Sequence, residues 1–195
     1  MTAKLKIFLA VSIGSLLLDQ ISKIWVATSL RIGIDEVKII PGFLSFVHAQ
    51  NPFAAMGLGS VISDTTVRMG LFAGFTVVAM GILLKMLKDL PGEDRFQSAI
   101  IALIFSGAIG NAIDRVHKQS VTDFIRVYTD YPPAKNWLLE RFGTYEWPTF
   151  NIADSAIVVG VALYLIGYLF EKDSAPAAEG SNPLDNPEEG ARPST

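Results

Sequence analysis

The sequence predicts an all-α membrane protein with four transmembrane helices, and both its composition and its apolar stretches support this fold class. Half of the 195 residues are hydrophobic and only 18% are charged, whereas a soluble domain usually carries about a quarter charged residues. Four stretches are apolar enough and long enough to cross a bilayer, which takes roughly 20 residues of helix. They cover residues 7–28, 67–87, 97–115 and 153–170. The small net charge of −3 argues against a nucleic-acid-binding surface.

The first stretch has some features of a secretory signal peptide, because Lys4 and Lys6 precede an apolar run. The run continues to Val26, however, which is too long for a typical signal-peptide core, and the small-residue site that follows it is poor. We therefore expect the first stretch to remain in the protein as a membrane span.

The second and third stretches are joined by a tight turn around Pro91 and Gly92, which predicts that they form antiparallel neighbours. Beyond Phe170 the composition changes abruptly to Pro, Ala, Glu, Gly and Asn, with almost no large apolar residue. Such a segment cannot bury enough apolar surface to fold. We expect one membrane domain over residues 1–170 and a disordered tail over residues 171–195.

Two long connections, residues 29–66 and 116–150, separate the spans. An even number of spans places both connections on one side of the membrane, with the termini and the 88–95 turn on the other. Apolar and polar residues alternate over short spans of these connections, as from Val37 to Val47, which predicts a few strands or a short surface helix. The lysines and arginines are spread over both sides and do not decide which side is cytoplasmic.

The first span carries Asp19 and Lys23 between apolar flanks. A charge in the hydrocarbon region costs at least about 2.5 kcal/mol, so each such residue suggests a function. The two residues are four apart and share a helix face, in the order that favours pairing. Two interpretations stay open: a self-neutralised structural pair, or part of a site inside the helix bundle.

The third span ends in a second polar group. Asn111 and Asp114 are three residues apart and share a face, while Gly107 permits the close approach of another helix. Arg115 follows Asp114 directly, and we expect the two to form a salt bridge, which is favoured over a catalytic role for Asp114.

Two further aspartates lie where the second long connection meets the membrane. Asp123 stands among apolar neighbours, so its ionised form should be disfavoured. Asp154 begins the fourth span, three residues after Asn151, a spacing that by itself is typical of helix capping. The topology nevertheless places both carboxylates at one membrane face. Two neighbouring carboxylates that share a proton can activate water and polarise a carbonyl, which is the equipment for peptide hydrolysis.

Other catalytic machinery is missing from the sequence. It contains no cysteine, no H-E-x-x-H, no G-x-S-x-G and no glycine-rich phosphate loop. His48 and His117 fall in the connections without metal-ligand spacing, and we expect both on the surface. We expect no metal ion and no organic cofactor.

Taken together, these residues resemble the bacterial lipoprotein signal peptidases (signal peptidase II), whose motifs match in order over roughly residues 18–157. The five matching blocks are Leu18 through Lys23, Asn51 through Gly57, Gly107 through Arg115, Val121 through Ile125, and Phe150 through Asp154 with Ile157. Each block alone is weakly specific, whereas five in the right order on a four-span chain are strongly specific.

The resemblance implies a membrane aspartic endopeptidase that removes signal peptides from diacylglyceryl-modified prolipoproteins, cutting before the lipidated cysteine. Asp123 and Asp154 match the catalytic aspartates. The supporting residues that match, with Lys23 added as the partner of Asp19, are Asp19, Lys23, Asn51, Gly107, Asn111, Asp114, Arg115, Asn151 and Ala153.

The resemblance also implies an arrangement in the bacterial inner membrane. It places both termini and the tail in the cytoplasm, the active site near the periplasmic face, and a small β platform with a short surface helix on the periplasmic side. The expected partners are the lipidated prolipoprotein and bilayer lipids, and we expect a monomer.

Two rival interpretations are a small proton-coupled transporter or channel that uses the intramembrane carboxylates, and a scaffold whose polar residues only join helices.

The sequence departs from the family pattern in two places. Phe53 and Met56 replace a glycine and a phenylalanine of the second block, and Pro52 restricts the backbone of Asn51. The connection from Asp123 to Asp154 also carries an insertion, residues 128–146. Its apolar residues are spaced to form one face of a short amphipathic helix, which we expect to rest on the membrane surface; they are Trp137, Leu138, Leu139 and Phe142.

Overall fold

The computed structural model describes residues 1–53 and 62–173 and contains the four membrane-spanning helices that the composition predicts. They are α1 (Ala3–Ser29), α2 (Thr65–Asp89), α3 (Arg95–Lys118) and α5 (Ile152–Asp173), and each encloses one predicted stretch. Helix α5 extends to Asp173, three residues into the expected tail. The rest of the tail and the Met56 departure lie outside the described residues.

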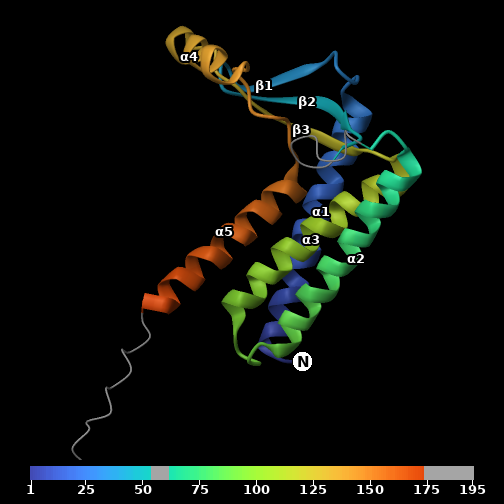
Figure 1. The fold of residues 1–195 in the computed structure, drawn as a ribbon, viewed down its shortest axis with the longest axis vertical. Coiled ribbons are helices and arrows are strands. Elements are labelled where there is room, and N and C mark those ends of the chain that lie inside the picture. Colours follow the sequence, from blue (N-terminus) through green and yellow to red (C-terminus); the bar gives the residue numbers. More distant parts are fainter. Residues whose placement is uncertain (54–61, 174–195) are drawn as a thin grey trace, which may run out of the picture.

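Helix α3 lies at the centre of the bundle, with α1, α2 and α5 packed around it (Figure 1). Two glycines permit the close approach of α3 and α5. A Cβ atom on Gly107 would overlap the Ala153 carbonyl oxygen, and one on Gly160 would lie 2.6 Å from the Ile104 side chain. Small residues serve this purpose where helices associate in membranes.

The two ends of the bundle differ in structure (Figure 1). At one end the N-terminus meets the turn between α2 and α3, where the Lys4 ammonium donates to the carbonyls of Leu87 and Leu90 at 2.9 and 2.6 Å. The C-terminal end of α5 lies at this end too. The strands and the remaining helix lie at the other end. The prediction from helix counting, that both long connections share one side, is therefore confirmed.

The two long connections together form one antiparallel sheet of three strands in the order β1-β2-β3. Strands β1 (Glu36–Ile40) and β2 (Leu44–Asn51) come from the first connection, where alternation predicted strands, and β3 (Val121–Val127) comes from the second. Phe124 of β3 packs on Val26 and Leu30 at the end of α1, which fixes the sheet on the bundle. The register places Ala49 opposite Asp123 and Asn51 opposite Val121.

The insertion forms the predicted short helix, α4 (Pro132–Phe142), which begins with two prolines and ends at Gly143 in the left-handed conformation with φ 72°. Prolines fit the first turn of a helix and glycine fits its end. In Figure 1, α4 stands beyond the sheet, to the side of the bundle on which α5 lies.

The prediction that both histidines lie on the surface is wrong for His48 and right for His117. His48 is buried within β2 and donates from Nδ1 to the Leu30 carbonyl oxygen at 2.8 Å. The buried ring therefore serves to join the sheet to the end of α1. His117 is exposed, but it lies in the last turn of α3 and not in a loop.

Candidate active site

Asp123 is held in β3 at the base of the sheet, with only 2% of its surface exposed. Its carboxylate accepts hydrogen bonds from two side-chain amides, Asn51 Nδ2 at 3.0 Å and Asn151 Nδ2 at 2.7 Å. Asn51 is the last residue of the neighbouring strand β2, and Asn151 is the residue before α5. Strand pairing and the start of a helix thus bring three distant segments together.

Burial raises the pKa of Asp123 to about 6, because the ionised carboxylate loses contact with water. The hydrogen bonds from Asn51 and Asn151 oppose this shift, while the nearby negative charge of Asp154 adds to it. The expectation that the ionised form of Asp123 is disfavoured is confirmed. Asp123 can therefore carry a proton at mildly acidic pH.

Asp154 lies in the first turn of α5, where it and Asn151 bond reciprocally. The Asp154 N–H donates to Asn151 Oδ1 at 2.9 Å, and the Asn151 N–H donates to Asp154 Oδ2 at 3.2 Å. The expected capping role is therefore present. The other oxygen of Asp154 accepts from Asn111 Nδ2 at 2.8 Å. Both carboxylate oxygens of Asp154 therefore accept hydrogen bonds from asparagine N–H groups.

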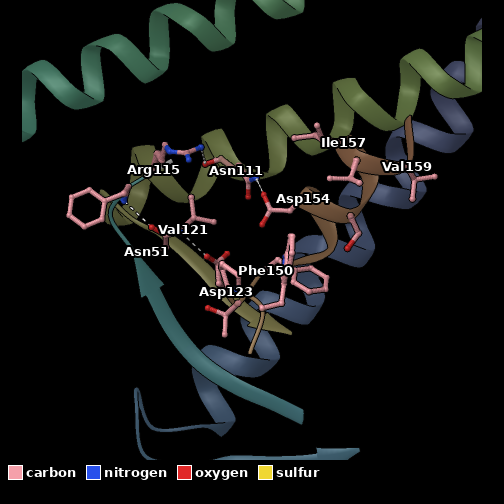
Figure 2. A pocket seen from close by; sticks show the side chains of 15 residues that line it. Asn51, Asn111, Arg115, Val121, Asp123, Phe150, Asp154, Ile157 and Val159 are labelled. Carbon is pink, nitrogen blue, oxygen red and sulfur yellow. Dashed lines mark hydrogen bonds between the residues drawn. The ribbon is translucent and has the colours of Figure 1, made fainter. Parts of the chain in front are cut away.

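The two aspartates open onto one cavity of about 540 Å³, and Figure 2 shows them close together between β3 and the start of α5. Arg115 of α3 reaches the same cavity. The remaining wall is mostly apolar and aromatic, and it includes Phe53, Val121, Trp147, Phe150, Ile157, Val158 and Val159. The arrangement combines two carboxylates with an apolar channel that suits an apolar peptide or lipid.

Beneath the cavity lies a buried cluster of charges centred on Lys23, whose side chain is 1% exposed. Its ammonium lies 2.9 Å from Asp19 Oδ2 and 3.3 Å from Asp114 Oδ2. The expected pairing of Asp19 with Lys23 is confirmed. The expected salt bridge between Asp114 and Arg115 is wrong, because Asp114 pairs with Lys23 and with Lys118, at 3.0 Å.

Arg115 and Asp114 point in different directions because consecutive residues of a helix do not share a face. The Arg115 guanidinium instead lies over the Phe72 ring of α2, 4.9 Å from its centroid. Asp114 also accepts from the Thr122 N–H at 3.0 Å, which fixes the start of β3 one residue before Asp123.

Lys23 also sets the orientation of two of the three amides that reach the aspartates, those of Asn111 and Asn151. Its third contact is Asn111 Oδ1 at 3.0 Å, and an ammonium can only donate. The Asn111 oxygen must therefore face Lys23, which turns its NH₂ group toward Asp154. The same oxygen accepts from Asn151 Nδ2 at 3.2 Å, which keeps the NH₂ group of Asn151 on the side of Asp123.

The structure also places the remaining supporting residues. Ala153 donates its N–H to Asp19 Oδ1 at 2.9 Å, and Gly107 leaves room for its carbonyl. Gly110, a small residue of the matching block from Gly107 to Arg115, also permits close packing, because a Cβ atom there would lie 2.5 Å from an Asp19 oxygen. Sequence reasoning missed Lys118, although its spacing of four residues from Asp114 was a usable signal.

Comparison with known proteins places this geometry in a family. Residues 11–170 match the family profile described as Signal peptidase (SPase) II. The chain is 37% identical to the lipoprotein signal peptidase of Geobacter sulfurreducens over 86% of this chain and 94% of the relative. It is also 37% identical to that of Staphylococcus carnosus, over 85% and 91% of the two chains. The chain belongs to the signal peptidase II family.

Solved structures agree with the membership in the signal peptidase II family. A bacterial membrane enzyme is similar to this chain with a TM-score of 0.70 at 30% identity, over 90% of this chain and 94% of the other. A second bacterial membrane enzyme gives a TM-score of 0.67 at 31% identity, over 83% and 92% of the two chains. The chain is therefore a protease of the bacterial membrane, with several membrane spans.

Within residues 1–53 and 62–173, no group of three or more His, Cys, Asp or Glu side chains is arranged to hold a metal ion. The absence of a metal and of an organic cofactor from the reaction stays a prediction.

Proposed function

We propose that the chain is an aspartic endopeptidase that removes the signal peptide from diacylglyceryl-modified prolipoproteins, cutting before the lipidated cysteine. The observation that carries this proposal is the pair Asp123 and Asp154, which open onto one cavity in two different environments. Membership in the signal peptidase II family and the names of the relatives supply the substrate class.

The environments divide the roles of the two aspartates. Asp154, in its ionised form, takes a proton from a water molecule whose oxygen attacks the scissile carbonyl carbon. Asp123, whose raised pKa favours its protonated form, donates its proton to the carbonyl oxygen. In the second half, Asp154 gives its proton to the leaving nitrogen, the C–N bond breaks, and Asp123 recovers a proton from the hydroxyl of the intermediate.

The apolar wall of the cavity suits the substrate that this reaction requires. A prolipoprotein with two acyl chains is confined to the bilayer, so it must enter laterally between helices. Ile157, Val158 and Val159 continue from Asp154 along α5 and line the cavity. Arg115, at the same cavity, can orient the peptide backbone or a lipid carbonyl by donating hydrogen bonds.

The membrane arrangement is part of the same proposal. Both termini lie in the cytoplasm, and the sheet, α4 and the two aspartates lie at the periplasmic face of the inner membrane, with the enzyme acting as a monomer. The family resemblance supports this orientation. Cysteines introduced at the exposed Ile34 and at Lys88 test it: a membrane-impermeant thiol reagent added to intact cells with a permeable outer membrane should label only Ile34→Cys.

The rival proton relay receives no support from the described contacts. Asp19, Lys23 and Asp114 are bonded to one another and to the polar groups around Asp154. They gather at one end of the bundle and do not form a path across it.

A cleavage assay tests the proposal directly. Purified protein in lipid is mixed with a diacylglyceryl-modified prolipoprotein, and release of the signal peptide is followed for wild type, Asp123→Asn and Asp154→Asn. Each substitution should lower the rate by about 10²–10⁴-fold, the usual contribution of a general acid or base. Asp35→Asn is the matched control, because Asp35 pairs with Arg31 in the first connection, away from the cavity. Normal cleavage by both site variants contradicts the mechanism.

A further inference from the structure

The insertion that carries α4 is an arm attached to the sheet, defined here as residues 128–147 (the α4 arm). The segments on either side of α4 meet at the isolated Tyr128–Glu146 bridge, and the Trp147 N–H donates to the Val127 carbonyl at 2.9 Å. Arg126 joins the base of the arm to β1 through Glu146 at 2.7 Å and Glu36 at 3.3 Å. The arm therefore holds α4 in a fixed position relative to the sheet.

The outer part of the α4 arm exposes large apolar side chains. No residue of α4, which is described over its whole length, is buried, and Trp137 and Phe142 are 59% and 63% exposed. Their rings contact each other edge to face, with centroids 5.8 Å apart, and so form one aromatic patch. In water such a patch is unfavourable, and patches of this kind mark interaction sites.

A basic residue accompanies the aromatic patch. Arg141 lies one helical turn after Trp137 and next to Phe142, and it is exposed. Tryptophan together with arginine on one side of a short helix is typical of helices that lie in the headgroup region of a bilayer. The arginine can reach lipid phosphates, while the aromatic rings enter the boundary of the acyl chains.

The position of the α4 arm favours a lipid surface as the binding partner of the aromatic patch. The arm starts and ends beside the last residue of β3, and its own last residue, Trp147, is 60% exposed and lines the catalytic cavity. Figure 1 shows α4 to the side of the bundle on the α5 side. Helix α5 presents Val158, Leu165 and Phe170 outward, to the space that lipid fills in a spanning helix. The exposed apolar surface of the spans thus continues through Trp147 to α4.

We propose that the α4 arm docks on the lipid headgroup region beside the catalytic cavity, with Trp137 and Phe142 as its anchors. The docked arm holds the cavity mouth at the depth where the lipidated cysteine of the substrate lies. The inference about the depth of the cavity mouth rests on the proposed function, whereas the docking itself does not. The arm then lowers the KM for a substrate in a bilayer without taking part in the chemical step.

Tryptophan fluorescence tests the docking without any cleavage. The chain has three tryptophans, Trp25, Trp137 and Trp147, so Trp25→Phe/Trp147→Phe leaves Trp137 alone. This variant is placed in vesicles of phosphatidylglycerol and dibrominated phosphatidylcholine, and acrylamide is the quencher from water. The Trp137→Phe/Trp147→Phe variant, which keeps Trp25 on α1, is the lipid-facing reference.

We expect the bromolipid to quench Trp137 about as strongly as Trp25, and acrylamide to quench it weakly. Strong quenching by acrylamide with none by bromolipid overturns the proposal. Shielding from both quenchers also overturns it, because another protein surface, such as a second copy of the chain, then covers α4. A mass measurement of the detergent-solubilised protein identifies that copy.

Kinetics test the consequence for the substrate. Trp137→Ser/Phe142→Ser should raise the KM for prolipoprotein in vesicles about three- to tenfold with kcat unchanged, since the loss is one of surface binding. In detergent micelles the same variant should match wild type. Asn136→Ser, on the same helix but outside the aromatic patch, is the matched control. Unchanged KM in vesicles, with cleavage intact, contradicts the role of the arm, whereas absent cleavage by wild type contradicts the proposed function instead.

Discussion

Replacement of Lys23 by methionine should destabilise the protein strongly, because it removes the ammonium at the centre of a buried charge cluster. In the native cluster two carboxylates, Asp19 and Asp114, face two ammonium groups, Lys23 and Lys118. Loss of one partner of a buried ion pair costs about 3–5 kcal/mol. Asp114 keeps Lys118 and the Thr122 N–H, so the loss falls mainly on Asp19 and should lie near the lower end, about 3 kcal/mol.

A double variant separates the charge balance from the orientation of the amides. Asp19→Asn/Lys23→Met removes both charges of the closest pair, and its free energy of unfolding should return to within about 1 kcal/mol of wild type. Its activity should not return, because Asn111 has lost the ammonium that fixes its oxygen. A hydrogen bond to a charged group contributes about 1.5–3 kcal/mol. Loss of the bond from Asn111 to Asp154 should therefore lower the kcat of the double variant about 10–100-fold.

Unfolding followed by circular dichroism in mixed micelles, combined with prolipoprotein cleavage in the same micelles, measures both effects. Lys85→Met is the control, because its partner Asp89 is exposed at the end of α2 opposite the site, where an ion pair contributes little. Wild-type stability of Lys23→Met would show that the cluster does not need its ammonium. Full activity of the double variant would show that Lys23 only neutralises Asp19 and does not orient Asn111.

Three further outcomes follow from the site. The kcat/KM should fall as pH rises through about 6, because Asp123 then loses the proton that it donates. Asn51→Ala should move this fall to higher pH, because it removes a hydrogen bond that lowers the pKa of Asp123. A pH–rate profile of each protein measures both effects. Gly107→Ala should destabilise by about 1–3 kcal/mol through overlap with the Ala153 carbonyl, whereas Gly70→Ala, with open space around it, should not, as thermal unfolding will show. EDTA should leave cleavage unchanged if the reaction needs no metal.

The helices, and the shared end of the bundle at which both long connections lie, could be predicted because they depend on composition and on an even count of spans. The partner of Asp114 could not be chosen from adjacency in the sequence. Arg115 is the next residue, but helix geometry turns it to another face, and the true partners are Lys118 one turn later and Lys23 on a different helix. The spacing of Lys118 was visible in the sequence, whereas the contact with Lys23 depends on how α1 packs against α3.

The same distinction holds for the sheet. Alternation indicated a few strands or a short surface helix in both connections, but the local pattern did not show that a strand with Asp123 would pair with β2. That pairing gives Asp123 its contact with Asn51 and buries it, and burial is the cause of its raised pKa. The surface prediction for His48 failed for a related reason. A polar residue in an alternating strand can face the bundle when its ring N–H has an acceptor there, as the Leu30 carbonyl is for His48.

The sequence left open which aspartate holds the proton, and the contacts of Asp123 favour it as the proton carrier. Asp123 accepts two amide hydrogen bonds, yet burial outweighs them and its pKa still rises to about 6. Asp154 lies at the start of α5, where it bonds reciprocally with Asn151. Asn151 contacts both, with its oxygen on the Asp154 N–H and its NH₂ group on Asp123. Because one amide cannot reverse without losing both bonds, Asn151 holds Asp123 and Asp154 in two different environments.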